Sequence, residues 1–253
     1  MKKLFSDLFL PTAITAILLI LMSASFKADD LITLSRAEFI SVMSQEQNEV
    51  QNTLIIDPGH GGADGGAVSI SGDNESLINL QISQKTELIA AFFGIKTVTT
   101  RDSEDIEYGE STISIHDKKV YDSNRRVDLI NNTNNAVLIS IHQNFYNDSN
   151  VTGAQVFYGN LNDSIGLAEN ITSNFKLFAA KVRIPCQISE TIYIFKKINC
   201  PAVLIECGFI SNYDENSLLT DKSYQNKIAL AIISGYLQYE NRLNYTVGGT
   251  YES

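Results

Sequence analysis

The sequence has few cysteines, histidines and basic residues, and these shortages exclude several classes of protein. Its three cysteines, Cys186, Cys200 and Cys207, are odd in number and lack the paired spacing of a zinc knuckle, so no disulfide framework is expected. Lys and Arg number 19 against 29 Asp and Glu, which gives a net charge of -10. A protein with this negative charge lacks the excess of basic side chains that would bind the phosphate backbone of a nucleic acid, so we expect no nucleic-acid partner. With 253 residues, 44% of them hydrophobic, the chain is long enough to bury the core of one sizeable domain.

The amino end has the pattern of an export segment. Lys2 and Lys3 precede an uncharged stretch over residues 8–26, and Ser23, Ala24 and Ser25 supply small residues at a plausible cleavage spacing. The apolar centre is about 15 residues long, shorter than the roughly 20 that span a bilayer. We therefore expect residues 1–26 to be a signal peptide, with an uncleaved membrane anchor as the alternative. Either way the protein is exported from the cytoplasm, and only this segment would contact a membrane.

The rest of the chain divides into a linker or pre-domain arm over residues 27–50, a single folded domain over 51–241 and a tail over 242–253. Within the domain, β-rich apolar runs alternate with helical periodicity. The runs expected to form strands are residues 53–57, 96–100, 136–141, 154–158, 191–195 and 202–206. Alternation of this kind predicts an α/β fold, with a mostly parallel, twisted six-stranded sheet and helices on both faces.

Side chains with metal or acid–base chemistry follow several of the expected strands. The first strand runs into the loop that contains His60, the strand over 136–141 ends at His142, and the strand over 202–206 ends at Glu206. Glu75 heads the first expected helix of the domain. Because ligands collect at the carboxyl ends of strands in open α/β sheets, these four side chains are expected to converge.

Two imidazoles and a carboxylate are a common ligand set for one catalytic Zn²⁺ ion, and they leave a fourth position for water. His60, Glu75 and His142 fit this set, and Glu206 would be the free carboxylate that acts as general base. Each residue alone also has an ordinary interpretation. A histidine can sit in a glycine turn or at the end of a strand, and an acid near a helix start stabilises the helix dipole. Glu206 is the most suggestive, because an acid after four apolar residues is costly to bury without a role.

Two other interpretations fail on detail. The glycine-rich run over residues 59–66 lacks the lysine of a phosphate-binding loop and the spacing of a dinucleotide-binding loop. Cys207 has no cationic neighbour in sequence to activate it as a nucleophile, and a thiol in a strand is usually a packing residue.

The motifs resemble those of the zinc-dependent N-acetylmuramoyl-L-alanine amidases of the amidase-3 type, over roughly residues 53–240. The matching segments are IIDPGHGGADGGA at 55–67, Glu75 with Asn79 and Leu80, Thr100–Asp102, Asn124 with Arg125, SIHQN at 140–144, GAQVFY at 153–158 and PAVLIECGFISN at 201–212. The resemblance implies that His60, Glu75 and His142 bind zinc and that Glu206 is the catalytic base. The substrate would be the peptidoglycan amide that joins the lactyl group of N-acetylmuramic acid to L-alanine.

The resemblance also bears on the biological role. The chain has neither the extra wall-targeting domain nor the inserted inhibitory helix of many cell-division members, so it looks most like the sporulation amidases. These strip the stem peptide as a first step toward muramic-δ-lactam in the spore cortex. The negative charge predicts repulsion from anionic wall polymers, so an accessory protein for localisation or metal retention is a further expectation. We also expect Asp57 to orient His60, on adjacency alone.

Two competing functions stay open at this point. The first is a non-catalytic, exported wall-binding or regulatory module that retains the fold; the presence of all four site residues argues against it. The second is a zinc peptidase that acts on protein, and its usual HExxH signature is absent from the sequence.

Overall fold

The computed structural model describes residues 51–109 and 112–247. The expected export segment (1–26) and the expected linker (27–50) lie outside the described residues. Over the ranges that are described, no helix combines the length and the hydropathy needed to cross a bilayer.

The described residues from Gln51 onward form an α/β domain around a six-stranded sheet with the strand order β2-β1-β3-β6-β4-β5. Along the chain the elements are β1 (Thr53–Pro58), α3 (Glu75–Phe92), β2 (Thr97–Thr99), α4 (Ile115–Asn131), β3 (Ala136–Asn144), β4 (Gln155–Tyr158), α5 (Asp163–Phe175), β5 (Cys186–Gln187), α6 (Tyr193–Lys197), β6 (Ala202–Phe209), α7 (Tyr213–Thr220) and α8 (Lys222–Val247). The predicted α/β class and the six-stranded sheet are confirmed.

The sheet is mixed, which corrects the expectation of a mostly parallel one. Strands β2, β1, β3 and β6 pair in parallel, and β4 pairs in parallel with β5, but β4 runs antiparallel to β6. The chain leaves β3 through a loop and returns along the far side of β6, so β4 and β5 reverse direction relative to the central strands. The parallel half of the sheet carries the residues that the sequence singles out.

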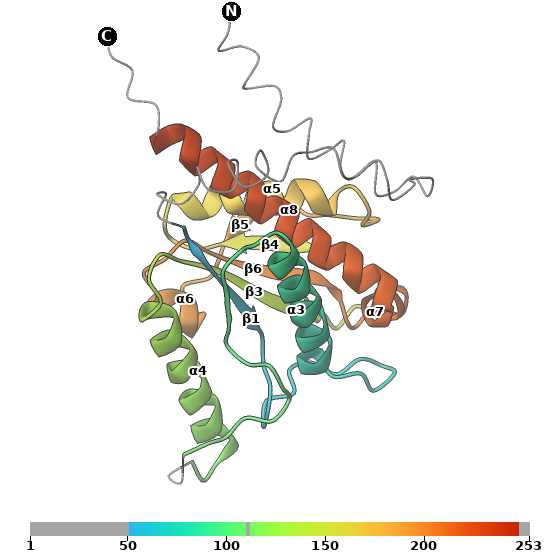
Figure 1. Ribbon diagram of the computed structural model, residues 1–253. Coiled ribbons are helices and arrows are strands. Elements are labelled where there is room, and N and C mark those ends of the chain that lie inside the picture. Colours follow the sequence, from blue (N-terminus) through green and yellow to red (C-terminus); the bar gives the residue numbers. More distant parts are fainter. Residues whose placement is uncertain (1–50, 110–111, 248–253) are drawn as a thin grey trace, which may run out of the picture. The chain divides into compact units, whose positions relative to one another are not determined.

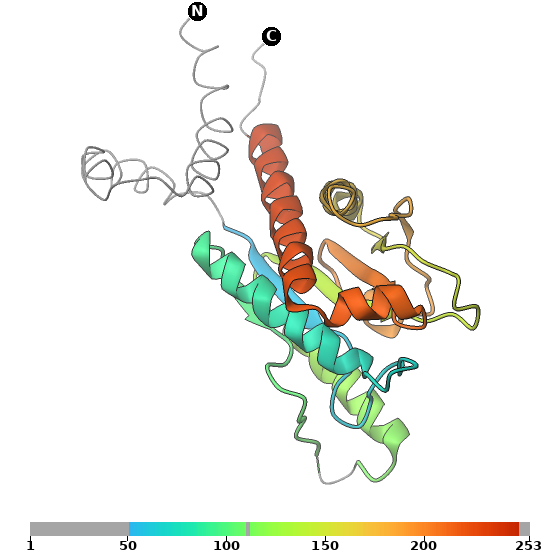
Figure 2. The same ribbon diagram turned by 90° about the vertical axis from the view of Figure 1, so that its right-hand side faces the viewer.

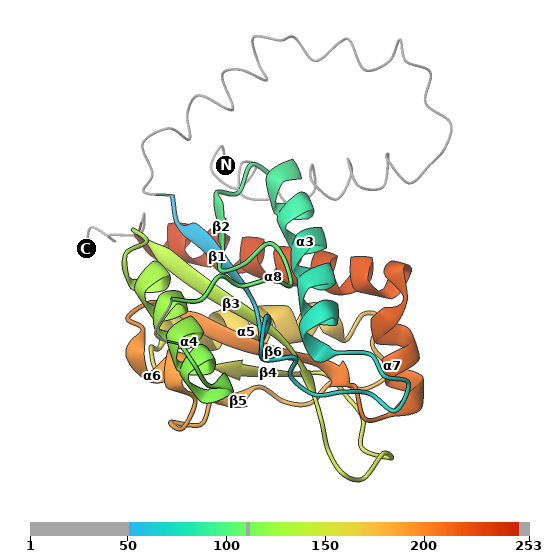
Figure 3. The same cartoon turned by 90° about the horizontal axis from the view of Figure 1, so that it is seen from below.

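The helices lie on both faces of the sheet, as predicted (Figure 1). Helices α3, α5 and α8 cover one face, where α8 packs against both α3 and α5. Helices α4 and α6 cover the other face and pack against each other. Figure 2 shows α3 and α8 running side by side, and Figure 3 shows α4 and α6 on the opposite side of the strands from α8.

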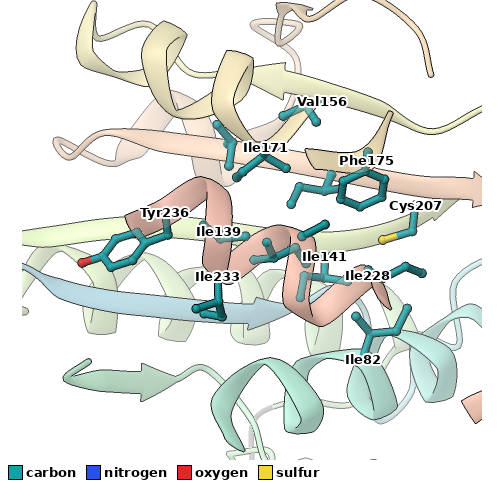
Figure 4. Close-up of a cluster of buried hydrophobic side chains, with 14 of the residues drawn as sticks. Ile82, Ile139, Ile141, Val156, Ile171, Phe175, Cys207, Ile228, Ile233 and Tyr236 are labelled. Carbon is teal, nitrogen blue, oxygen red and sulfur yellow. The ribbon is translucent and has the colours of Figure 1, made fainter. Parts of the chain in front are cut away.

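Each face has its own hydrophobic core, because the central strands are apolar on both sides. The larger core joins the sheet to α3, α5 and α8. Figure 4 shows part of it, including Ile139, Ile141, Ile171, Phe175, Ile228 and Ile233. The smaller core lies under α4 and α6 and includes Ile55, Leu138 and Phe195. Burial of these side chains supplies the main driving force for folding.

One predicted strand is wrong. Residues 191–195, TIYIF, are β-branched and aromatic, but Tyr193–Lys197 form the short helix α6, and the remaining strand of the sheet is Cys186–Gln187. Phe195 is buried in the smaller core while Tyr193 is exposed, so one helical turn places the apolar side chains against the sheet. Tertiary packing here outweighs local strand propensity.

Two features at the carboxyl end differ from the sequence expectation. Helix α7 was not predicted, and α8 continues to Val247, past the expected domain boundary at residue 241. Helix α8 also comes very close to α5, because a Cβ atom added at Gly235 would lie 2.7 Å from Ile171 Cα. Only glycine permits this approach of the two helices.

Candidate metal centre

The four singled-out side chains come from elements that meet at the carboxyl ends of the parallel strands. His60 follows β1, His142 lies in β3 and Glu206 lies in β6, and these three strands are neighbours in the sheet. Glu75 is the first residue of α3, which packs against both β1 and β3. The fold therefore brings these four side chains together, as expected.

His60, Glu75 and His142 come together as one cluster of possible metal ligands. One atom from each residue lies within 4.8 Å of the others. Glu75 Oε1 is 3.2 Å from His60 Nε2 and 3.0 Å from His142 Nδ1. Two atoms that each lie about 2.0–2.1 Å from one tetrahedral ion are about 3.3 Å apart, so this spacing suits a single small cation. The two nitrogens and one oxygen are a donor set that zinc commonly takes.

Glu75 is fixed by hydrogen bonds to both carboxylate oxygens. Oε1 accepts from the backbone N–H of Gln143 at 3.1 Å, and Oε2 accepts from the backbone N–H of Ala67 at 2.9 Å. The backbone at Gly66 has φ +70°, and a Cβ atom there would lie 2.6 Å from Glu75 Oε2. A side chain at Gly66 would therefore displace the carboxylate. Burial favours the neutral acid, but bonding to His142 and His60 outweighs it and holds the pKa of Glu75 well below its usual range.

The loop that presents His60 is held by two arginines. His60 has φ +60°, a conformation that costs energy for a residue other than glycine. Arg101 donates to the carbonyls of Pro58, Gly59 and His60, and Arg126 donates to those of Pro58 and His60. Both guanidinium groups are buried. These bonds explain how the strained backbone at His60 persists.

In the sequence, Arg101 and Arg125 stand out only as motif residues, and Arg126 does not stand out. Arg125 is half-buried and donates to the Thr100 carbonyl. Arg126 is the fully buried partner of the His60 loop. The sequence shows that Arg125 and Arg126 are neighbours on one expected helix. Which of the two faces the sheet depends on how α4 packs, and local sequence does not determine that packing.

The expected role of Asp57 is wrong. The Asp57 carboxylate accepts from Thr100 Oγ1 at 2.6 Å, Ser140 Oγ at 2.6 Å and Arg126 Nη1 at 2.8 Å, which leaves it engaged away from His60. Its three partners come from the segment after β2, from β3 and from α4, and they hold the carboxylate away from His60. Burial works against ionisation, but Arg126 and the two hydroxyls keep the pKa of Asp57 below its usual value.

Asp64 holds the position that was assigned to Asp57. Its Oδ2 lies 3.0 Å from His60 Nδ1, and its Oδ1 lies 2.8 Å from Lys119 Nζ. Burial alone would lower the pKa of His60, but hydrogen bonds to Asp64 and Glu75 raise it to about 9. The sequence does not predict this role for Asp64, because an aspartate in a loop belongs to no helical or strand periodicity that would place it beside His60. The turn, with Gly61 and Asp64 bonded to each other through the backbone, brings the two side chains together.

Glu206 occupies the register position next to His142 on the adjacent strand. Its Oε2 is inaccessible to solvent and has no hydrogen-bond partner among the described residues. Desolvation raises the pKa of Glu206 to about 7, with Glu75 adding to the effect and the two histidines opposing it. A carboxylate oxygen that is shielded from solvent without a hydrogen-bond partner is costly, and it is the arrangement expected of a group that exchanges protons near neutral pH.

His60, His142 and Glu206 open onto a cleft of about 420 Å³. One wall is α4, through Lys118, Lys119, Asp122, Ser123 and Arg126. The other wall is formed by residues 191–194 together with Leu204. The segment wrongly expected to be a strand is thus part of the cleft wall.

The fold and this cluster define a class of protein, an α/β protein with three possible metal ligands beside a carboxylate that has no ion-pair partner among the described residues. Residues 54–238 match the family described as N-acetylmuramoyl-L-alanine amidase. The chain belongs to this family of enzymes, which act on peptidoglycan.

Individual relatives agree with the family assignment. The germination-specific N-acetylmuramoyl-L-alanine amidase of Bacillus subtilis (strain 168) is 32% identical over 187 residues, which cover 74% of this chain and 78% of the relative. The CwlD amidase of Clostridioides difficile, solved in complex with the GerS lipoprotein, has 36% identity and a TM-score of 0.72, over 76% of this chain and 99% of that one. The catalytic domain of CwlV, an N-acetylmuramoyl-L-alanine amidase from Bacillus (Paenibacillus) polymyxa var. colistinus, has 27% identity and a TM-score of 0.64, over 76% and 99%.

Proposed function

We propose that this amidase is zinc-dependent, with His60, Glu75 and His142 as the metal ligands and Glu206 as the general base. The observation that carries the proposal is the meeting of these three donors beside Glu206, whose Oε2 is shielded from solvent and has no hydrogen-bond partner among the described residues. The bond cleaved is the amide between the lactyl group of N-acetylmuramic acid and L-alanine of the stem peptide.

In this proposal, some residues of the chain bind the metal ion and Glu206 transfers the proton. When bound, zinc would supply Lewis-acid polarisation of the scissile carbonyl and lower the pKa of a water molecule. Glu206 takes the proton from the attacking water on its carboxylate and delivers it to the departing amide nitrogen. A pKa near 7 suits both steps, because the group must accept and then release one proton.

Asp64 acts through His60. By accepting from Nδ1, it fixes the imidazole with Nε2 toward Glu75, which is the orientation that metal binding requires. Arg101 and Arg126 fix the backbone of the same residue. The metal site is therefore held before any ion binds, which lowers the cost of binding.

The test of the activity uses purified full-length protein and muropeptides of known structure. We expect mass spectrometry to find intact stem peptides with a free alanine amino group, together with the corresponding peptide-free glycan. Removal of metal with a chelator should abolish release, and one equivalent of zinc should restore it. Product formation that is unaffected by the chelator would contradict zinc dependence.

We further propose that the enzyme acts in the spore cortex, in the route to muramic-δ-lactam. Support comes from the name of the Bacillus subtilis relative, which is a germination-specific amidase. Cortex from spores without this enzyme should lack muramic-δ-lactam. Wild-type protein should restore the lactam, and Glu206→Gln protein should not. Normal lactam without the enzyme would contradict the role.

We also propose that the protein is exported and that it has a protein partner. Residues 1–26 would direct the chain out of the cytoplasm, as a signal peptide or an anchor, and residues 51–241 would be the catalytic domain. The CwlD amidase of Clostridioides difficile was solved with a lipoprotein, which supports a partner for this chain as well. Full activity and one zinc per chain in the protein purified alone would show that no partner is required.

A further inference from the structure

The two walls of the cleft beside the metal centre differ in chemistry. Lys118 and Lys119 stand on the α4 wall, whereas Ile192, Ile194 and Leu204 give the opposite wall an apolar surface. A peptide with methyl side chains and carboxylates matches a cleft with apolar side chains on one wall and lysines on the other.

Among the described residues that line the cleft, Lys118 is the cationic side chain that is not paired with a carboxylate. Asp64 is engaged by His60 and Lys119, and Asp122 is engaged by Arg125 and Arg126. Lys118 makes no ion pair with any described residue. The cleft thus offers a positive charge to whatever occupies it, although the chain as a whole is acidic.

Lys118 is also held in place close to the metal ligands. Its ammonium group lies 5.2 Å from the centre of the Tyr108 ring, a cation–π contact. The hydroxyl of the same Tyr108 accepts from the backbone N–H of Ala63, three residues after His60. The next residue, Lys119, bonds to Asp64, which bonds to His60. These short connections place the Lys118 charge within reach of the first residues of a bound peptide.

From these observations we infer that the cleft between α4 and residues 191–194 binds the stem peptide, and that Lys118 binds a carboxylate on the residue that follows L-alanine. The inference rests on the amidase function proposed above and names its specificity-determining residue. The apolar side chains of the wall opposite α4 accommodate the alanine methyl group.

The test uses two disaccharide dipeptides that differ in one property. Both carry L-alanine, and the second residue is D-glutamate with free carboxylates in one and the corresponding diamide in the other. The variants, made in the full-length chain, are Lys118→Met, Lys118→Arg and, as a matched loss of one charge far from the cleft, Lys176→Met. Lys176 is exposed at the end of α5.

We expect Lys118→Met to lower kcat/KM for the acidic substrate about tenfold, through KM, because a charge-assisted hydrogen bond in a partly exposed cleft is lost. The same variant should stay within about twofold of wild type on the diamide. Lys118→Arg should retain most of the activity on the acidic substrate, and Lys176→Met should match wild type on both. Zinc content should be unchanged in all variants.

An equal loss on both substrates, or no loss on either, would overturn the role of Lys118. Such a result differs from failure of the proposed function, because wild-type turnover of both substrates establishes the amidase activity by itself. If wild-type protein with full zinc cleaves neither substrate, the function and the inference are overturned together.

Discussion

His142 and Glu206 lie side by side in register on the parallel strands β3 and β6. Parallel pairing puts both side chains at the same end of the sheet, where His142 belongs to the cluster of possible metal ligands and Glu206 has a carboxylate oxygen that is shielded from solvent without a described partner. The register of two strands thus sets the position of the proposed proton acceptor relative to the proposed metal site. A shift of one residue would send one of the two side chains to the other face.

Replacement of Glu206 should separate catalysis from metal binding. We expect Glu206→Gln to lower kcat by about 10²- to 10⁴-fold, because the amide cannot accept the proton. Zinc content, measured by mass spectrometry of the metal, should match wild type, since Glu206 is not proposed as a ligand. Glu169→Gln, at an exposed position of α5, is the matched control and should be fully active. A variant that loses zinc along with activity would argue that Glu206 is a ligand.

Asp64 and Asp57 should behave differently when each becomes asparagine. Asp64→Asn removes the carboxylate that orients His60, so we expect zinc affinity to fall about 10- to 100-fold, with activity restored at high zinc. Competition with a fluorescent chelator measures the affinity. Asp128→Asn, an exposed change on α4, serves as the control. Unchanged affinity in Asp64→Asn would remove the positioning role.

Asp57→Asn should instead lower stability. It leaves the buried Arg126 without one of its two carboxylate partners, and breaking a buried pair costs about 3 kcal/mol. Urea unfolding of the zinc-free protein, compared with Asp128→Asn, measures the free energy. A stability equal to wild type would contradict the structural role of the pair.

The same carboxylate predicts a pH dependence. The pKa of Asp57 is lower in the folded protein than its usual value of 3.8, so the unfolded chain binds the proton more tightly. Its contribution is therefore fully present above pH 3.8 and is lost as the pH falls through the folded pKa. The stability gap between wild type and Asp57→Asn should be constant from pH 7 to about pH 5 and should shrink below about pH 4. A gap that grows in acid would contradict this sign.

The contact between α5 and α8 gives a test of the fold. Gly235→Ala would place Cβ 2.7 Å from Ile171 Cα, a backbone atom that cannot move alone. We expect a loss of about 2 kcal/mol from overpacking, although alanine is the better helix former by about 1 kcal/mol. Thermal unfolding measures the loss. Ser234→Ala, the preceding half-buried residue in α8, should unfold at the wild-type temperature, within about 2 °C. An equally stable Gly235→Ala would mean that the two helices are farther apart.

The amino-acid sequence by itself determined most of the strand-and-helix alternation, the placement of His60, His142 and Glu206 on or just after apolar strands, and the family. Those features are local or periodic, so they can be read from neighbouring residues. Only the tertiary structure decided that Tyr193–Lys197 form a helix beside the cleft instead of a strand, that β4 runs antiparallel to β6, and that Asp64 rather than Asp57 supports His60. Each of these depends on contacts between segments or on the path of a turn, and burial against distant residues overrides what the local sequence favours.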